Sequence, residues 1–212
     1  MKKYKLVCTC TLALTISQAF AVEELPEIEV VGTSLLPGLE IEKEKLPYEV
    51  RSFQSEELGN ETSLGITDVL NQNIPGVFTN EVQGSPYQGD VTFRGFRASS
   101  ILGAAQGLSV YIDGIRINEP FGDVVNWDMI PEFAIDNISL VPGSNPMYGL
   151  NTLGGALSLT TKSALSDPGK VARVSLGSFS RKKVDVSLAG KFSAGDGGDY
   201  FLAASHFDES GW

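Results

Sequence analysis

The side chains that could carry out catalysis are few and scattered along this chain. His206 is the single histidine, so no His-x-x-x-His metal pair can form. The sequence contains no cysteine cluster and no Gly-x-Ser-x-Gly turn of a serine hydrolase, and its glycine-rich stretches lack the lysine of a phosphate-binding loop. Repeated carboxylates occur only near the N-terminus, where nothing is expected to fix their geometry. The sequence therefore predicts no enzyme, no protein-bound metal and no cofactor.

Residues 1–21 have the three parts of a secretory signal peptide. A start with three lysines precedes an apolar run at residues 6–16, and Ala19-Phe20-Ala21 offers a small-x-small cleavage site. The apolar run is too short for a membrane-spanning helix, and an interfacial anchor is the alternative reading. Both cysteines, Cys8 and Cys10, fall inside this segment. The mature chain is therefore predicted to lack disulfides, thiolate metal ligands and a cysteine nucleophile.

The charge balance excludes one class of partner. The chain has 16 basic and 26 acidic residues, a formal charge of −10, and losing the three signal lysines makes it −13. Nucleic-acid binding needs a basic surface, so we expect no nucleic-acid partner. No later run approaches the roughly 18 apolar residues of a membrane helix. Any membrane insertion would have to use β-strands.

Residues 22–45 are predicted to be a flexible segment. They are acidic, are interrupted by Pro26, Pro37 and Gly38, and have too little apolar surface to order themselves. Within them, Glu27-Ile-Glu-Val-Val-Gly32 is a short run with β-strand propensity. A chance apolar patch in a mobile tail is the alternative reading.

Residues 46–162 are predicted to form a small α+β domain with a mixed sheet, short helices and long loops. Glycine, proline and asparagine separate the apolar runs, which have the lengths of short strands. The first expected elements are a strand at 50–53 and a helix that is capped by Thr62 or Ser63 and ended by Asn73-Ile-Pro-Gly-Val77. Strands are expected next at 91–96 and 108–117, and the strand at 108–117 contains an Asp113-Gly114 turn. A helical turn at 131–134 and strands at 135–141 and 156–161 complete the domain.

The last two of these strands flank a connector with a distinctive residue order. It contains a Tyr148-Gly149 pair and a Gly154-Gly155 pair, and it resembles the end of the plug domain in TonB-dependent outer-membrane receptors. Three earlier motifs resemble the same family in the same order: a leucine-containing helix ending in Pro-Gly-Val at 68–77, the Arg94-Gly95-Phe96 strand, and Tyr111-Ile-Asp-Gly-Ile115. The resemblance covers residues 27–212.

Residues 163–212 are similar to the first barrel strands of that family. Segments at 172–177, 184–190 and 200–207 alternate apolar with polar or small residues, and the second and third are separated by a Gly195-Asp-Gly-Gly198 turn. A plugged transporter has about 22 strands, and the smallest such barrels have about eight. We therefore interpret the sequence as a plug domain followed by about three strands of a truncated transmembrane β-barrel. His206 is expected to face the pore or to lie in a turn.

The resemblance implies an N-terminal fragment of a receptor for active uptake of a ferric chelate, such as a siderophore or ferric citrate. The receptor would lie in the cell outer membrane of a Gram-negative bacterium, in contact with lipid through its complete barrel, with the plug and its N-terminal segment facing the periplasm. Two alternatives stay open. One is a periplasmic plug module that binds TonB without transport, and the other is a receptor for cobalamin, haem or a carbohydrate.

The resemblance also implies three groups of site residues. The TonB box would be Glu27, Ile28, Glu29, Val30, Val31 and Gly32, which pair with TonB as an added strand. Ligand-facing residues would lie in plug loops near 81–89, 98–107 and 118–127, and their aromatic and amide side chains suit a large oxygen-rich ligand: Gln83, Tyr87, Gln88, Gln106, Asn118, Phe121, Asn126 and Trp127. Arg94 would contact the barrel, but Pro142 stands where the family has a second arginine.

Overall fold

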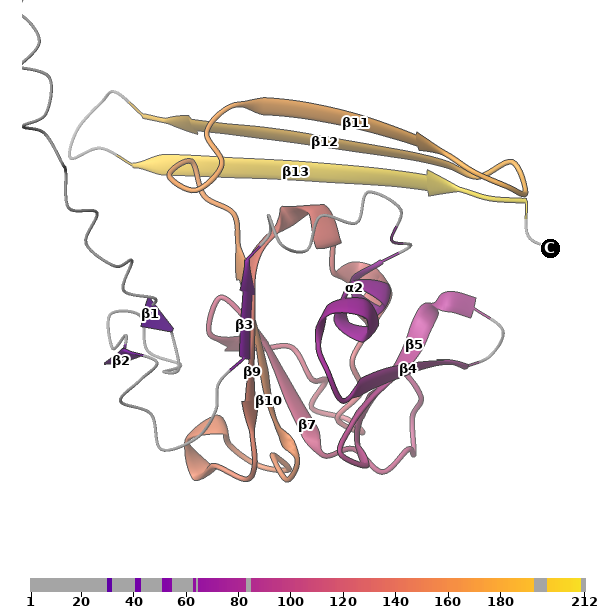
Figure 1. Cartoon of the computed structure of the whole chain (residues 1–212), viewed down its shortest axis with the longest axis vertical. Coiled ribbons are helices and arrows are strands. Elements are labelled where there is room, and N and C mark those ends of the chain that lie inside the picture. Colours follow the sequence, from indigo (N-terminus) through magenta and orange to yellow (C-terminus); the bar gives the residue numbers. More distant parts are fainter. Residues whose placement is uncertain are drawn as a thin grey trace, which may run out of the picture.

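A computed structural model describes residues 30–31, 41–42, 51–54, 63, 65–82, 85–192 and 198–210. The predicted signal peptide, most of the predicted TonB box and the glycine-rich turn after residue 192 lie outside the described residues. Figure 1 shows two parts: a compact domain formed by residues 51–162, and a three-stranded sheet that lies across one side of it. No helix of the described part of the chain is long and apolar enough to cross a membrane.

The main sheet of the compact domain has five strands in the order β3-β9-β10-β7-β8. The bounds are Arg51–Gln54 for β3, Ile135–Pro142 for β9, Gly155–Thr161 for β10, Leu108–Ile112 for β7 and Ile115–Arg116 for β8. Strand β10 is parallel to β7 and antiparallel to β9. The sheet is therefore mixed, as the sequence predicts.

A second, antiparallel sheet contains β4 (Val77–Val82), β5 (Ser85–Phe93) and β6 (Phe96–Ser99). Helix α2 (Ile66–Asn73) packs beside it and buries Ile66, Val69 and Leu70. The helix begins after Gly65, whose extended backbone makes no side-chain cap. The N-cap residue is therefore Gly65, not the predicted Thr62 or Ser63. The negative charge of Asp68 in the first turn interacts favourably with the positive end of the helix dipole.

The hydrophobic core lies between these two sheets and the helix. Its buried side chains come from all three elements, and they include Leu70, Val91, Phe93, Val110, Ile138 and Leu159. Short 3-10 helices close its edges: η2 at Trp127–Met129, η3 at Glu132–Ala134 and η4 at Pro146–Tyr148. Burial of this apolar surface is the main driving force for the fold.

Two hairpin turns use residues with positive φ. Asp113 and Gly114 join β7 to β8 with φ of 49° and 78°, as expected for the predicted turn. Arg94 and Gly95 join β5 to β6 in the same way, with φ of 51° and 87°. The predicted single strand at 91–96 is therefore wrong. An arginine with positive φ is uncommon, so the sequence offers little sign of this turn.

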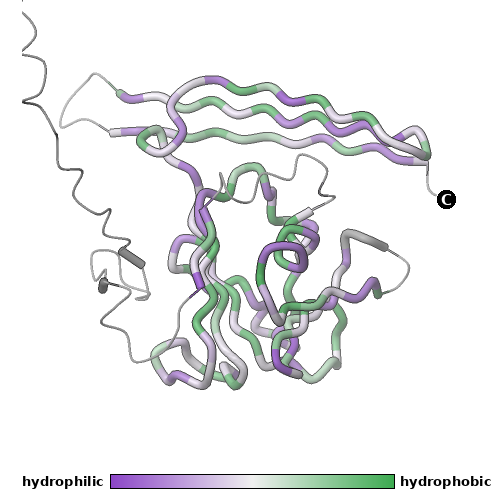
Figure 2. Tube along the Cα trace, in the orientation of Figure 1, coloured by the Kyte–Doolittle hydropathy of each residue, from purple (hydrophilic) through white to green (hydrophobic). Residues whose placement is uncertain are grey.

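The three-stranded sheet, called the C-terminal sheet below, is antiparallel and consists of β11 (Lys170–Leu176), β12 (Lys182–Lys191) and β13 (Asp199–Asp208). Hydrophobic and hydrophilic residues alternate along it (Figure 2). Lys183 and Asp185 are largely buried, whereas Val184 and Val186, which follow them on the opposite face, are exposed. His206 pairs with Val184 on the exposed side, so it does not face the domain and does not lie in a turn.

A short antiparallel ladder joins β1 (Val30–Val31) to β2 (Ile41–Glu42). Val30 pairs with Glu42, and Val31 pairs with Ile41. The centre of the predicted TonB box is therefore already in strand conformation, and one edge of it is occupied by the chain itself.

Candidate functional site

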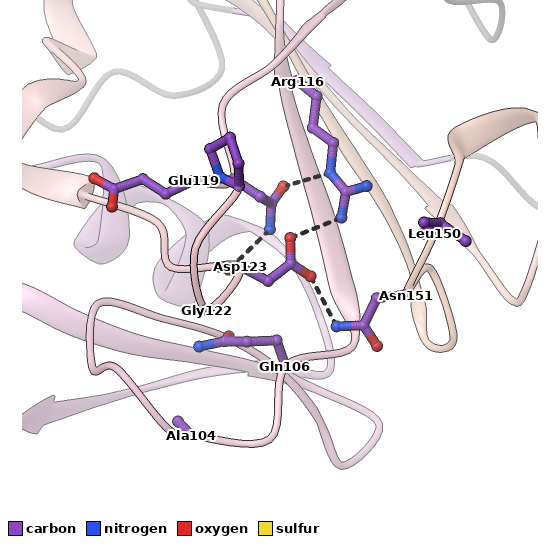
Figure 3. Close-up of a pocket in the computed structure, with 10 residues that line it drawn as sticks. Ala104, Gln106, Arg116, Glu119, Gly122, Asp123, Leu150 and Asn151 are labelled. Carbon is purple, nitrogen blue, oxygen red and sulfur yellow. Dashed lines mark hydrogen bonds and ion pairs between the residues drawn. The ribbon is translucent and has the colours of Figure 1, made fainter.

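An open pocket of about 700 Å³ lies at the end of the main sheet where β7 and β10 begin (Figure 3). Two of the three predicted ligand-facing loops reach it, together with the connector between β9 and β10. The residues that line it are Ala104, Gln106, Arg116, Asn118, Glu119, Pro120, Gly122, Asp123, Leu150 and Asn151.

Asp123 joins two walls of the pocket. Its Oδ1 accepts a hydrogen bond from Arg116 Nη2 at 2.8 Å, and its Oδ2 accepts one from Asn151 Nδ2 at 2.7 Å (Figure 3). Asp123 and Asn151 both have positive φ, 56° and 60°. Such a backbone is uncommon outside glycine, although aspartate and asparagine tolerate it best. The hydrogen bonds of Asp123 therefore tie the loop after β8 to the connector before β10.

Asn118 forms the floor of the pocket and is only 7% exposed. Its Oδ1 accepts from the Val110 N–H at 2.7 Å, and its Nδ2 donates to the carbonyls of Leu108 at 3.1 Å and Asp123 at 3.3 Å. These bonds tie the loop after β8 to strand β7. Both ends of the amide are thus engaged within the fold.

Gln106 stabilises the neighbouring loop in a similar way, through hydrogen bonds to the backbone. Its Oε1 accepts from the Ser99 N–H at 2.7 Å, and its Nε2 donates to the Ser99 carbonyl at 3.3 Å. The side chain therefore closes the loop that follows β6. It shapes the pocket wall more than it offers free groups to a ligand.

Exposed apolar side chains lie next to this polar centre. Leu150, in the pocket lining, is 86% exposed, and Phe121 and Leu102 in the adjoining loops are also largely exposed. Among the lining residues, Glu119 and Asp123 outnumber the single cation Arg116. The surface combines an acidic and amide-rich floor with an apolar rim, which suits a bulky ligand with both polar and apolar parts.

Tyr111 on β7 lies behind the pocket and holds the connector between β9 and β10 in place. Its hydroxyl donates to the Tyr148 carbonyl, and the two rings are 5.8 Å apart between centroids. Burial raises the pKa of the Tyr111 phenol, and the Arg116 charge partly offsets this. The phenol is therefore held neutral as a hydrogen-bond donor.

The structure places the predicted ligand-facing residues in several environments. Gln106 and Asn118 line the pocket, Phe121 is exposed beside it, and Asn126 donates to the Glu119 carboxylate. Gln88 is half-buried in β5 and is not part of the lining. Gln83 lies outside the described residues, as does the side chain of Tyr87.

Trp127 does not fit the prediction that it faces a ligand. It is 2% exposed, and its Nε1 donates to the Ala98 carbonyl at 3.0 Å. A tryptophan with its one donor satisfied inside the core is a packing residue. From sequence, burial in the core was the open alternative to a ligand contact for this residue, and the structure shows burial.

Four polar residues of the pocket lining were not singled out from sequence: Arg116, Glu119, Asp123 and Asn151. Arg116 follows the Asp113-Gly114 turn by two positions, and Asn151 lies in the connector 28 residues after Asp123. Only the pairing of strand β10 with β7 brings these segments together. The one sequence feature that could have indicated a pocket residue here was the amide of Asn151, which lies close to the Tyr148-Gly149 pair.

Arg94, the predicted barrel contact, lies exposed in its hairpin turn with its guanidinium 5.1 Å from the centre of the Phe93 ring. Arg97 on β6 lies 3.4 Å from the Asp90 carboxylate. Pro142 ends β9 and carries no charge. Arg94 is thus free of the core, in a position from which it can reach outward.

The pocket and the exit of the chain lie at opposite ends of the main sheet. Gly155 starts β10 beside the pocket loops, and Thr161 ends it next to the Asp113-Gly114 turn, where Thr161 Oγ1 donates to Asp113 Oδ2 at 2.7 Å. From there the chain continues to β11 in the C-terminal sheet. No group of three or more His, Cys, Asp or Glu side chains suited to a metal ion occurs within the described ranges.

Comparison with known proteins gives a consistent result. Residues 42–156, more than half of the chain, match the family model described as TonB-dependent Receptor Plug Domain. The ferric aerobactin receptor of Klebsiella pneumoniae is 28% identical over 135 residues, covering 62% of this chain and 16% of the receptor. The hemin receptor of Yersinia enterocolitica is 26% identical over 162 residues, covering 75% and 22%.

The vitamin B12 transporter BtuB of Vibrio vulnificus is 29% identical over 134 residues, covering 63% of this chain and 19% of that protein. The chain thus spans 16–22% of the length of these three relatives.

Solved structures share the fold at low identity. The pyoverdine outer membrane receptor FpvA of Pseudomonas aeruginosa PAO1 has a TM-score of 0.59 and 16% identity, covering 81% of this chain and 23% of that one. BauA, the ferric preacinetobactin receptor of Acinetobacter baumannii, has a TM-score of 0.56 and 17% identity, covering 81% and 24%.

Proposed function

This chain belongs to the TonB-dependent receptor plug domain family, and from that premise we propose that it forms the N-terminal part of an outer-membrane receptor for TonB-dependent uptake of a ferric chelate. The relatives are receptors and transporters, not enzymes. The predicted α+β plug fold, with its mixed sheet followed by three antiparallel strands, is confirmed. The cargo, the orientation of the plug in the membrane and the binding partners of the receptor are parts of the proposal.

The observation that carries the proposal is the position of the pocket. Its walls come from the loops after β6 and β8 and from the connector before β10, at the end of the sheet opposite the link to β11. If the chain enters the barrel wall from the periplasmic side, the pocket faces outward. Cargo would then settle on the pocket, while the TonB box stays near the inner side.

The C-terminal sheet supports the outer-membrane location. Its polar residues Lys183, Asp185 and Ser187 alternate with exposed Val184 and Val186. Alternation with an apolar outer face is typical of strands in an outer-membrane barrel. The apolar face would contact lipid, and the polar face would contact the plug.

Uptake would begin with a change in the pocket loops. A cargo that competes for Asp123 or Asn151 would alter how the loop after β8 is held to the connector. Cargo binding can favour a second plug state only by the difference in its affinity for the two states. In that state the Val30–Val31 strand would be offered to TonB, which would add its own strand to the free edge.

A ferric chelate is the cargo favoured by two observations. Two of the relatives cited above are named as ferric aerobactin and ferric preacinetobactin receptors. The pocket also offers amides, an ion pair and an apolar rim, which suit a large chelate with oxygen-rich and apolar parts. Hemin and vitamin B12, named for other relatives, are the alternatives.

Growth on defined iron sources tests this proposal. A strain lacking the intact receptor gene would be compared with the complemented strain on ferric siderophores, ferric citrate, haem and, separately, cobalamin. We expect receptor-dependent growth on one ferric chelate, and we expect it to disappear in a strain without TonB. Growth that depends on the receptor but not on TonB would refute the uptake mechanism, and dependence on cobalamin alone would refute the iron cargo.

A further inference from the structure

Within the described part of the chain, an ion pair connects the compact domain to the C-terminal sheet. Lys183 on β12 contacts the Oε1 atom of Glu132 in η3. The two side chains are only 13% and 15% exposed. The contact is therefore shielded from water and counter-ions, unlike an ordinary pair between surface charges.

The sheet side of this contact is positioned by two further residues. Asp185 lies two residues after Lys183 on the same face of β12, with its Oδ2 3.8 Å from Lys183 Nζ. Its Oδ1 accepts a hydrogen bond from Ser205 Oγ on β13 at 2.6 Å. Lys183 is thus held between one carboxylate of its own sheet and one carboxylate of the domain.

The packing around the contact is sparse. A hollow of about 290 Å³ is lined by Glu132 and Lys183 together with Ala203 and Ser205 of β13. A second hollow of about 200 Å³ is lined by Phe133 and Asp185. Side chains therefore do not fill the space beside the ion pair.

We propose that Glu132 and Lys183 form a latch that holds the plug against the barrel wall and can be released. This inference rests on the proposed function. Its polarity is the reverse of the predicted contact, because here the plug supplies the acid and the wall supplies the base. Arg94, the cation predicted to contact the barrel, lies exposed in a turn, and its barrel contact stays a prediction.

The arrangement of charges explains why the latch can open. When the plug moves away, Lys183 keeps Asp185 as a partner, and the Glu132 carboxylate passes into water. Neither charge is left buried and unpaired, which is the state that makes breaking a buried pair costly. Glu132 also begins η3, which ends directly before Ile135 of β9, and the Lys162 N–H donates to the Ala134 carbonyl at 2.9 Å. A shift of η3 would therefore accompany movement of the sheet ends.

The test uses the complete receptor in outer-membrane vesicles, with a cysteine introduced by Ser187→Cys, because Ser187 is 8% exposed and lines the hollow that Phe133 and Asp185 also line. The rate of maleimide labelling at this position measures how often the plug and wall separate. Since reversal of one charge leaves like charges facing each other in a shielded site, Glu132→Lys or Lys183→Glu should raise this rate by about tenfold or more. The double exchange Glu132→Lys/Lys183→Glu restores opposite charges across the contact and should lower the rate below that of either single reversal, but not fully to the parental value, because the new carboxylate at position 183 lies beside Asp185.

Lys182→Glu is the matched control, because Lys182 is exposed on the opposite face of β12 and should leave the labelling rate unchanged. If the charge reversals prevent assembly, Glu132→Gln keeps the shape of the side chain and should still speed labelling. Unchanged labelling in Glu132→Gln and the single reversals, or no recovery in the double exchange, would overturn the latch. The assay needs neither cargo nor TonB, so it can succeed even if the uptake proposal fails, and the reverse also holds.

Discussion

The Phe96 side chain lies directly against the backbone of Gly154. A Cβ atom added at position 154 would come within 2.5 Å of the Phe96 ring. Both the Leu153 and Gly154 N–H groups donate to the Gly107 carbonyl, and the Gly143 N–H donates to the Gly154 carbonyl at 2.9 Å. The glycine pair that marks this family in the sequence therefore allows the connector to approach β6.

We expect Gly154→Ala to lower the free energy of unfolding by about 1–3 kcal/mol, because the added methyl group overpacks the contact with Phe96. Urea unfolding followed by the fluorescence of buried Trp127 would measure this change. Gly198→Ala is the control, since a Cβ there meets only an ordinary 3.5 Å contact with Phe192. Equal stability of Gly154→Ala and the parent protein would contradict the close approach.

Asn118→Ala should also destabilise the fold. It leaves the buried Val110 N–H without its 2.7 Å acceptor and removes donors to two carbonyls. Unsatisfied buried groups of this kind cost about 1–3 kcal/mol in the free energy of unfolding. Asn126→Ala, a half-buried residue whose amide meets the exposed Glu119, should change it by about 0.5 kcal/mol or less. Equal effects of the two substitutions would mean that Asn118 has no special role.

The raised pKa of Tyr111 predicts a loss of stability in alkali. Burial favours the neutral phenol in the folded state, so the unfolded chain loses its proton first as the pH rises above about 10. The stabilisation is complete below that pH and is lost as the pH rises through the folded pKa. Unfolding midpoints measured between pH 8 and 11 would show the decrease.

Tyr111→Phe provides the comparison for this pH dependence. It removes the titrating group, and the Tyr148 carbonyl still accepts from Thr152 Oγ1 at 3.0 Å. We expect a shallower decrease in stability above pH 10 for this variant. A decrease as steep as that of the parent protein would assign the effect to other groups.

Asp123→Ala tests the pocket as the cargo site. The substitution removes the partner of both Arg116 and Asn151, so the loop after β8 and the connector are no longer held in register. We expect affinity for the cargo identified by growth to fall about tenfold, within the range seen when a central binding residue is truncated. Titration of the purified receptor would measure it, with Asp136→Asn on β9 as a control outside the pocket lining. Unaltered affinity would place cargo recognition elsewhere.

Much of the fold could be predicted because local signals agree with it. The strands at 135–142 and 155–161 are apolar runs bounded by glycine and proline, and the Asp113-Gly114 turn is a strong hairpin signal. The Arg94-Gly95 turn was missed because arginine disfavours positive φ, and there the sheet pairing overrides that preference.

The pocket was only partly predictable, for a different reason. Gln106 and Asn118 were identified as loop amides, but their main bonds are to the backbone of their own domain. The contact of Asp123 with Asn151 depends on the parallel pairing of β10 with β7, which no local pattern reports. Burial of Trp127 likewise depends on tertiary packing and cannot be read from a loop segment.

The most direct test of TonB-dependent uptake is Val30→Pro in the complete receptor. Proline removes the backbone N–H at a position that lies in a strand, so it should prevent TonB from adding a strand there. We predict that cargo binding to cells stays at the parental level while energised uptake of the same radiolabelled cargo falls to the level of a strain without TonB. Uptake at the parental rate in Val30→Pro cells would contradict the assignment of this segment as the TonB box, and with it the proposed mechanism.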